Sequence, residues 1–535
     1  MKYRIFLGLI VLITVSCQRA PKYDIIIRNG KIYDGSGNAA RQTHMGIRND
    51  MIVSLDVPSH ASAKKIIDAK ERVVSPGFID IHAHLDPLDN LIRLSHGESQ
   101  IRQGVTTSFG GPDGRGVPPG FGFKQFLDSL EKVGVGINVG FLTGHNKIRK
   151  AVMGLDNRAP TAEELKQMKQ QVSQAMTEGA FGISTGLKYL PGNFSEVDEV
   201  IALSKEVAIK GGIYTSHLRD EGLEIMKAIR EAISISKNAD LPVVLTHHKV
   251  IGKPMWGKSV ATLSLVDSAR QKGLKILLDQ YPYNASHTGI SVLIPTWARA
   301  GGQAAFLERI ADPKTNADIT KQIIYNILND RGGDDLRRIQ FSRVRWNPEL
   351  EGKTLYDWAI DRGMEPTLAN GAKLVIEAQS NGGAGCIFHA MDETDVERIM
   401  QFPFTMIASD GRLSEPGVGH PHPRAYGTFP RVLGRYVREK KIVSLEEAIY
   451  KMTGFPAKTM GLADRGLLKE GMKADITIFD PKTVIDNATF TEPHQYPSGI
   501  DYVIVNGQLV VEQGKFTPIK AGKVLRKMIS AKSKK

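Results

Sequence analysis

The stretch from Val74 to Leu462 alternates short apolar runs with amphipathic segments of helical periodicity. Such alternation is typical of parallel sheets whose strands are joined by helices. The runs that we interpret as strands are residues 78–81, 105–109, 138–142, 182–185, 213–216, 243–246, 276–279, 385–388 and 405–408. About eight or nine strands in this order predict an α/β fold, a (β/α)8 barrel, in which functional side chains stand at the carboxyl ends of the strands.

The two ends of the chain follow a different pattern, with short β-rich runs in place of helices. Asn29-Gly30 and Asn506-Gly507 lie between such runs, and Asn-Gly in this setting is a strong hairpin signal. We therefore expect a small β-sandwich domain built from residues 18–75 and 463–520. The barrel would then occupy residues 76–462.

Two further segments stand apart from this plan. Residues 288–351 interrupt the alternation, and we expect an inserted segment there that covers the barrel mouth and the substrate. Residues 521–535 include the densest basic cluster and are interpreted as a basic tail. The 535-residue chain has a formal charge of +13, but its other basic residues are scattered. Because zinc-finger spacing and the aromatic–basic signature of an RNA-binding sheet are both missing, we expect no nucleic-acid partner.

Polar side chains that suit a metal ion follow several of the predicted strands. His82 and His84 end the first strand, and their spacing of two points both imidazoles the same way. His217, His247 and Asp410 follow three later strands. A lone histidine is usually structural, but four histidines and an aspartate at barrel strand ends predict a metal centre.

Imidazole and carboxylate without thiolate favour zinc, as one or two ions, with manganese, iron or cobalt as alternatives. Such a centre lowers the pKa of bound water from 15.7 to about 7 and polarises a carbonyl group. Asp410 is the candidate catalytic residue, since a carboxylate there can take a proton from the water and pass it to a leaving nitrogen. Together these groups predict hydrolysis of an amide-like bond.

The N-terminus has the pattern of a targeting segment. A positive start is followed by the eleven-residue apolar run Ile5–Val15, which is too short to span a bilayer. We predict a signal peptide over residues 1–17 with Cys17 lipidated, although Thr14 stands where a lipoprotein signal usually has leucine. The alternative is an ordinary signal peptide. The expected location is the bacterial periplasm or cell envelope, with membrane contact only through the lipid anchor.

Longer motifs carry a resemblance to a known family. They are residues 76–84 (PGFIDIHAH), 103–107 (QGVTT), 182–187 (GISTGL), 216–221 (SHLRDE), 247–249 (HHK), 279–283 (DQYPY), 409–411 (SDG), 422–424 (HPR), 427–436 (GTFPRVLGRY) and 466–475 (GLLKEGMKAD). These resemble the amidohydrolase superfamily and, more narrowly, the N-acyl-D-amino-acid deacylases, or D-aminoacylases. The resemblance covers nearly the whole chain beyond the predicted signal peptide.

The resemblance implies an activity: hydrolysis of the amide bond of N-acyl-D-amino acids, or of dipeptides with a C-terminal D-residue, with release of the D-amino acid. It places the metal ligands at His82, His84, His217, His247 and Asp410, and the general acid–base also at Asp410. It also implies that Lys249, Tyr281 and Arg424 hold the α-carboxylate of the substrate. A guanidinium fork with an ammonium and a phenol suits that role physically.

The chain departs from the family pattern at three places. D-aminoacylases have a metal-ligating cysteine in a Gly-Asn-Cys-Gly turn, where this chain has Asp113 in Gly-Pro-Asp-Gly. Lys188 follows the fourth strand, where related hydantoinases bridge two metals with a carboxylated lysine. We hypothesise that Asp113, carboxylated Lys188, or both replace the cysteine; alternatively, Lys188 only binds substrate or lies at the rim. His287 stands where the family has a small hydroxyl residue, which leaves the side-chain preference open.

Two other functions remain as alternatives. The first is a cyclic-amide hydrolase of the hydantoinase or dihydroorotase kind, which would need the carboxylated Lys188. The second is a surface lipoprotein that keeps the fold and binds a ligand without catalysis. The complete set of candidate ligands argues against this second alternative.

Overall fold

The computed structural model describes residues 22–85, 88–117 and 122–528. The predicted signal peptide and the lipidation site Cys17 lie outside these residues, as does the end of the basic tail. Within the described part of the chain, no helix is both long enough and apolar enough to cross a bilayer.

Among the described residues, eight parallel strands form the wall of a barrel, as the sequence predicts. They are β6 (Phe78–Asp80), β8 (Val105–Gly110), β9 (Asn138–Phe141), β11 (Gly182–Gly186), β12 (Ile213–His217), β13 (Val243–Leu245), β14 (Ile276–Gln280) and β18 (Thr405–Ile407). Their pairings are parallel and run β6–β8–β9 and β11–β12–β13–β14–β18.

Short contacts close the two gaps in the barrel wall. Between β9 and β11, Phe181 N donates to Phe141 O at 2.9 Å. Between β18 and β6, the chain extensions pair in parallel as β19 (Gly411–Arg412) and β7 (Ala83–His84). Here Asp410 N also donates to His82 O at 2.8 Å. This closure brings the end of the last strand beside the histidines that follow the first.

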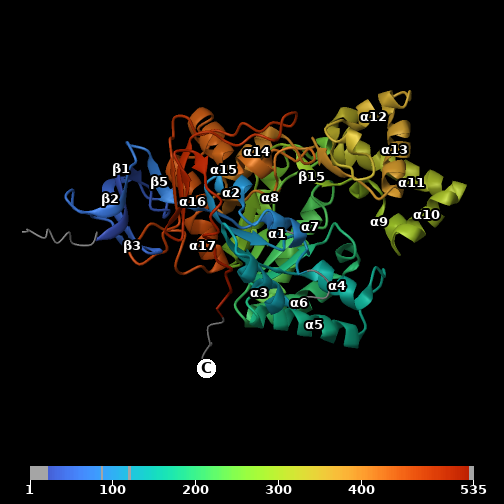
Figure 1. Ribbon diagram of the computed structural model, residues 1–535. Coiled ribbons are helices and arrows are strands. Elements are labelled where there is room, and N and C mark those ends of the chain that lie inside the picture. Colours follow the sequence, from blue (N-terminus) through green and yellow to red (C-terminus); the bar gives the residue numbers. More distant parts are fainter. Residues whose placement is uncertain (1–21, 86–87, 118–121, 529–535) are drawn as a thin grey trace, which may run out of the picture.

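Helices cover the outside of the barrel because each presents one apolar face to it. In α7 (Ile225–Ala239), Ile225, Ala228, Ile229 and Ala232 are buried, which matches one stripe of a helix with 3.6 residues per turn. The other main covering helices are α3 (Phe123–Val133), α5 (Ala162–Thr177), α6 (Val197–Ile209), α8 (Ser259–Gln271), α14 (Glu393–Gln401) and α16 (Leu445–Met452). Figure 1 shows them around the central strands.

The insertion is larger than the predicted segment 288–351. The run 385–388, predicted as a barrel strand, is β17 (Gly385–Phe388), which lies antiparallel between β15 (Ser286–Gly289) and β16 (Ile339–Arg343). The insertion also contains α9 (Thr296–Arg299), α10 (Gln303–Ala311), α11 (Pro313–Asn326), α12 (Leu355–Asp361) and α13 (Leu368–Ser380). It has its own hydrophobic core, from Ile290 to Ala390. A short apolar run is equally typical of a barrel strand and of this small sheet, so periodicity could not separate them.

Both chain ends build one nine-stranded sheet. Its strands are β1 (Tyr23–Ile32), β2 (Arg41–Arg48), β3 (Met51–Ser54), β4 (Ala63–Asp68), β5 (Val73–Pro76), β20 (Ile476–Phe479), β21 (Ile500–Val505), β22 (Gln508–Glu512) and β23 (Lys515–Phe516). The antiparallel pair β5–β20 joins the two ends. In Figure 1 this sheet and the helices of the insertion lie at opposite ends of the molecule.

The two Asn-Gly signals have different outcomes. Asn506 and Gly507 have φ of 46° and 77° and connect β21 to β22 as a hairpin, as predicted. Asn29, with φ of 55°, lies inside the continuous strand β1, where the register against β2 shifts between Ile27 and Gly30. The hairpin prediction is therefore wrong here. A left-handed residue forms a bulge when the strand continues to pair beyond it.

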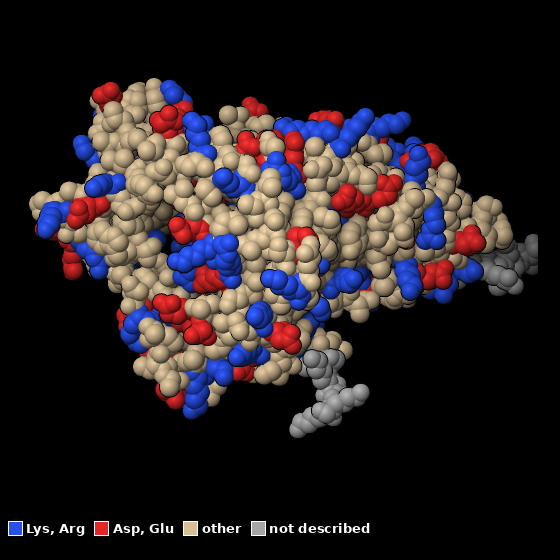
Figure 2. Space-filling view, turned by 180° about the vertical axis from the view of Figure 1, so that it is seen from behind, with Lys and Arg blue, Asp and Glu red and all other residues tan. Residues whose placement is uncertain are grey.

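The predicted basic tail is partly integrated into the barrel. Ala521 is buried, Leu525 N donates to Val139 O at 2.7 Å, and Lys527 N donates to Gly179 O at 3.0 Å. Residues 521–528 therefore lie along the start of β9 and do not form a free tail. On the face of the molecule in Figure 2, basic and acidic side chains are interspersed.

Candidate metal centre

The candidate ligands gather where β6 and its extension meet β12, β13 and β18. Two groups have ligand atoms within 4.8 Å of one another: His82, His84, Asp113 and Asp410 form the first, and Asp113, His217 and His247 the second. Every member is buried. The structure thus brings together all the histidines and both carboxylates predicted as ligands, and Asp113 belongs to both groups.

Several separations within these groups are those of ligands that share an ion, whereas His247 Nε2 and His217 Nδ1 lie only 2.6 Å apart, in hydrogen-bond contact. His82 Nε2 lies 3.6 Å from Asp113 Oδ1 and 3.4 Å from Asp410 Oδ1. In the second group, Asp113 Oδ1 lies 3.5 Å from His247 Nε2 and 3.7 Å from His217 Nδ1. Two ligands held about 2.1 Å from one ion in a tetrahedral arrangement stand roughly 3.4 Å apart. Asp113 is the residue that the two groups share, and it would contribute to holding an ion in either of them.

A tight turn after β8 presents the Asp113 carboxylate. Asp113 and Gly114 both have left-handed backbone, with φ of 56° and 70°, and a Cβ on Gly114 would lie 1.9 Å from Asn146 Oδ1. Ser184 on β11 stabilises the turn by two hydrogen bonds. Its Oγ donates to Gly111 O at 2.6 Å and accepts from Gly114 N at 3.1 Å. The turn is thus fixed against the neighbouring strand.

Left-handed backbone recurs at two more of the ligands. His247 has φ of 37° and Asp410 has φ of 48°. Non-glycine residues rarely adopt these values, and such strain is commonly found at functional sites where the surrounding structure compensates for it.

The electrostatics of the cluster suit a cation. Burial opposes charge on Asp113, yet His82, His217 and His247 hold the pKa of its carboxyl well below the usual range. Burial likewise opposes charge on His82, but Asp113, Asp410 and Asp279 raise its pKa well above the usual value. His82 Nε2 and Asp113 Oδ1 are buried without a hydrogen-bond partner among the described residues. A divalent ion would satisfy both atoms, so the residues present fit the metal predicted from the sequence.

Glu221 is a member of the site that the residue pattern did not single out. Its carboxylate lies 3.1 Å from His247 Nδ1 and 3.7 Å from His217 Nε2, on the side of each ring opposite Asp113. A carboxylate behind a metal-binding imidazole fixes the ring orientation and raises its basicity. Glu221 follows His217 by four residues in the quoted SHLRDE motif, so only the motif pointed to it.

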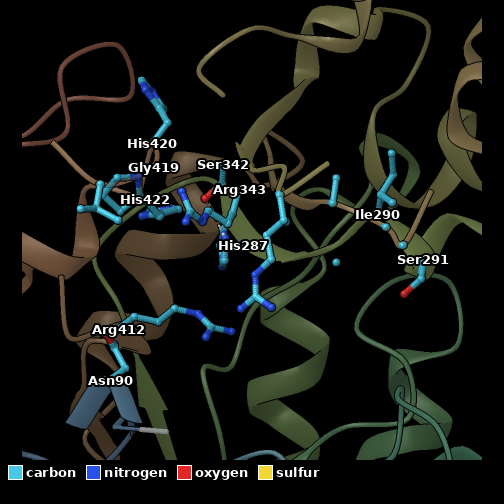
Figure 3. Close-up of a pocket in the computed structure, with 18 of the residues that line it drawn as sticks. Asn90, His287, Ile290, Ser291, Ser342, Arg343, Arg412, Gly419, His420 and His422 are labelled. Carbon is cyan, nitrogen blue, oxygen red and sulfur yellow. Dashed lines mark hydrogen bonds between the residues drawn. The ribbon is translucent and has the colours of Figure 1, made fainter. Parts of the chain in front are cut away.

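A cavity of about 1060 Å³ opens beside the cluster, between the barrel and the insertion. Asp410 and Arg424 both line it, and Arg424 Nη1 lies 2.8 Å from Asp410 Oδ2. The close-up in Figure 3 shows His287 and Arg412 among the residues of its wall. Asp410 therefore belongs to the metal cluster and to the cavity at once.

The three predicted carboxylate-binding residues are neighbours. Arg424 Cζ and Lys249 Nζ lie 4.6 Å and 5.6 Å from the centre of the Tyr281 ring. Of the three, only Arg424 lines the cavity. Lys249 is buried against Glu221, and its Nζ lies 2.6 Å from His247 Nδ1. Direct substrate contacts by Lys249 and Tyr281 remain predictions.

Lys188, the remaining predicted ligand, pairs with carboxylates that belong to neither ligand group. Its ammonium lies 3.1 Å from Asp220 and 3.6 Å from Asp330, which comes from the insertion. Burial opposes the charge, but these two carboxylates raise the pKa of Lys188. A lysine held charged in this way is a poor candidate for carboxylation, which requires the neutral amine. The contacts favour a role in attaching the insertion to the barrel.

Known proteins resemble this chain over nearly its full length. Residues 65–511 match the model described as Amidohydrolase family. The D-aminoacylase of Alcaligenes xylosoxydans xylosoxydans is 36% identical over 526 residues, which cover 94% of this chain and 97% of the relative.

Two solved structures share the fold. One, of a D-aminoacylase with a binuclear metal centre, has a TM-score of 0.80 and 34% identity, and the match covers 94% of this chain and 100% of that one. The other is the N-acyl-D-glutamate deacylase from Bordetella bronchiseptica in complex with zinc and a phosphonate inhibitor. It has a TM-score of 0.79 and 33% identity, and the match covers 95% of this chain and 100% of that one.

Proposed function

Because this chain belongs to the amidohydrolase family, we propose that it hydrolyses N-acyl-D-amino acids, or dipeptides that end in a D-residue, and releases the D-amino acid. The observation that carries the proposal is the position of Asp410, which joins the metal cluster to the cavity and contacts Arg424 there. The names of the related D-aminoacylase and N-acyl-D-glutamate deacylase support the substrate class.

We assign zinc to the cluster formed by His82, His84, Asp113, His217, His247 and Asp410. When bound, zinc supplies a water of lowered pKa and polarises the scissile carbonyl. Asp113 takes the place of the bridging thiolate of the family, and a carboxylate is a harder ligand than a thiolate.

Asp410 is the group that moves the proton. Its Oδ1 lies 2.9 Å from His84 Nε2, and its Oδ2 lies 2.8 Å from Arg424. Burial opposes ionisation, but Arg424, His82 and His247 keep the pKa of Asp410 well below its usual range. The carboxylate is thus ionised and oriented. It accepts the proton of the attacking water and delivers it to the leaving nitrogen.

Arg424 is placed to bind the α-carboxylate of the substrate. Its guanidinium lines the cavity next to Asp410 and lies over the ring of Tyr281. A carboxylate bound there would lie close to the group that protonates the leaving nitrogen, as an α-amino acid product requires. The cyclic-amide alternative has no such carboxylate to bind. It also depends on a carboxylated Lys188, whereas Lys188 pairs with Asp220 and Asp330.

A substrate screen tests the proposed function. We expect the zinc-loaded enzyme to hydrolyse N-acetyl-D-amino acids and L-Xaa-D-Xaa dipeptides and to leave the N-acetyl-L series nearly untouched. Arg424→Ala should lower kcat/KM on the D-series by about 10- to 100-fold, because a charge-assisted, bidentate contact is lost. Zinc is measured on the same samples. Turnover of the L-series alone, or of hydantoins at a rate insensitive to Arg424→Ala, would contradict the proposal.

We further propose that Cys17 carries a lipid and holds the enzyme at the envelope of a bacterial cell. The support is the sequence pattern of residues 1–17. In a bacterial host, the full-length chain should sediment with membranes, and Cys17→Ser should release it to the soluble fraction because one anchor is lost. Identical fractionation of both forms, with a mature mass that lacks lipid, would favour the ordinary signal peptide.

A further inference from the structure

We propose that Arg331 of the insertion is a positioning residue of the metal centre: it holds the Glu221 carboxylate against the imidazoles of His217 and His247. The insertion therefore takes part in the metal centre as well as in the cavity wall. The inference rests on the proposed function, because it concerns the zinc centre of that enzyme. Arg331 itself stands apart from the residues that line the cavity.

Arg331 is a buried cation where the insertion meets the barrel. It is 1% exposed and ends η4 (Ile327–Arg331), a π-helical turn of a kind that is frequent at functional sites. Its Nη1 donates to Ser286 Oγ at 3.3 Å. Its Nε and Nη2 have no hydrogen-bond partner among the described residues, although Nε lies 3.5 Å from Asp330 Oδ2. Buried donors are normally paired, so a guanidinium with two unpaired nitrogens indicates a specific role.

The carboxylate of Glu221 lies between Arg331 and one of the metal-binding rings. Arg331 Nη2 lies 3.8 Å from Glu221 Oε2, and the same oxygen lies 3.7 Å from His217 Nε2. His217 Nε2 also has no hydrogen-bond partner among the described residues. Because His217 Nδ1 faces Asp113, Nε2 carries the proton whenever Nδ1 binds an ion. Glu221 Oε2 is thus placed between a guanidinium and an imidazole N–H.

The other oxygen of Glu221 has different partners. Lys249 Nζ donates to Oε1, and His247 Nδ1 lies 3.1 Å from the same oxygen. Without Arg331, the carboxylate is free to turn both oxygens toward the ammonium of Lys249, and its contact with His217 weakens. Arg331 therefore keeps one oxygen for each ring. A carboxylate in this position fixes the orientation of a metal-binding imidazole and strengthens its hold on the ion.

Glycines allow the segment that carries Arg331 to approach the barrel closely. A Cβ on Gly252 would lie 2.3 Å from Asn329 O, and one on Gly222 would lie 2.8 Å from Asp330 Oδ1. Gly222 and Gly252 belong to the loops that follow β12 and β13. The segment is therefore packed directly against the loops that carry the carboxylate and the ammonium, and the position of Arg331 is fixed.

Zinc titration of the metal-stripped, full-length chain, by competition with a chelator, tests the inference without any substrate. Arg331→Met should lower the zinc affinity by about 10-fold, at the lower end of the range for residues that support metal ligands. Arg331→Lys, which keeps the buried charge and loses the fork, should lower it by about threefold. In a Glu221→Gln background, either substitution should change the affinity by less than about twofold, because its effect passes through the carboxylate.

Arg149→Met is the matched control. Arg149 is also fully buried and bonds to Glu199, whose other oxygen lies 2.7 Å from His145 Nε2. The same three residue types thus meet away from both ligand groups. This control should lower the Tm of the metal-free chain, because a buried carboxylate loses its partner. Its zinc affinity should stay within about twofold of the unaltered value.

Three results would overturn the inference. Unaltered zinc affinity in a folded Arg331 variant is the first. A raised affinity is the second, since it shows that the guanidinium only repels the cation. An equal loss in the Glu221→Gln background is the third, since the effect then does not pass through the carboxylate. Turnover of N-acetyl-D-amino acids by the unaltered, zinc-loaded enzyme is measured in parallel. Its absence would overturn the proposed function, whereas the three results overturn only the positioning role.

Discussion

Asp410→Asn is expected to lower kcat on N-acyl-D-amino acids by roughly 10²- to 10⁴-fold, the range for loss of a general acid–base group. Asparagine has nearly the volume of aspartate, but its amide cannot accept and return the proton. His84 and Arg424 hold the two carboxylate oxygens in place. The substitution therefore removes the proton carrier and leaves the packing intact. Steady-state kinetics of the zinc-loaded variant, with zinc content measured on the same sample, give the result.

Measurement of the zinc content distinguishes the role of Asp410 as a metal ligand from its role in proton transfer. The first ligand group keeps His82, His84 and Asp113 in the variant, so zinc should remain bound at saturating concentration. Asp486→Asn is a matched control, because Asp486 is also a buried carboxylate beside an arginine, Arg431 at 2.9 Å, but lies outside the ligand set. Its folded form should keep kcat near the unaltered value. If zinc-bound Asp410→Asn retains more than about a tenth of kcat, another group moves the proton.

Asp113→Ala is expected to weaken zinc binding more than the substitution of any residue that contacts the ligands without binding the ion itself. The second group would fall to His217 and His247, fewer than the three protein ligands of a typical zinc site. The zinc affinity of the second group should fall by at least about 10²-fold. Substitution of a residue that only contacts the ligands typically lowers the affinity by about 10- to 100-fold. Titration of the metal-stripped chain with zinc measures this directly. Thermal unfolding should show a smaller zinc-dependent rise in Tm for the variant.

Asp113→Cys provides the matched comparison. It places a thiolate in the same turn, so zinc binding should persist, while the preference for harder ions such as manganese should weaken relative to zinc. One result would contradict this prediction. If Asp113→Ala binds zinc with unaltered stoichiometry and affinity, Asp113 is not a ligand, and its position in both candidate ligand groups does not affect metal binding.

The four histidine ligands and Asp410 could be predicted from the sequence because each barrel strand is formed by a few consecutive residues. A parallel strand is recognisable from a few residues. In each strand–helix repeat of the barrel, the residue that follows the strand stands at the carboxyl end of the barrel. His82, His217, His247 and Asp410 are up to 328 positions apart and still meet, because β7 and β19 close the wall beside them. Asp113 was predicted in a different way, from the resemblance, because it stands where the family has a metal-ligating cysteine.

Contacts between distant segments were less predictable. Glu221 acts on His247 from another strand end, and Lys188 pairs with Asp330 of the insertion. Neither contact leaves a trace in periodicity or in local propensity. The strand 385–388 was assigned to the wrong sheet for a related reason: its apolar pattern shows burial, and burial is the same against the barrel or against the core of the insertion.

The sequence by itself determined the barrel, the β-rich domain made from both ends, and the residue types that suit zinc and amide hydrolysis, because each depends on short-range pattern. Only the tertiary structure decided which carboxylate joins the two ligand groups, where Lys188 lies, and how the insertion and the barrel together line one cavity. These features arise from side chains that approach one another across strands and across the insertion. Their positions depend on how the whole chain packs, and the order of residues along the sequence does not give the distances between these side chains.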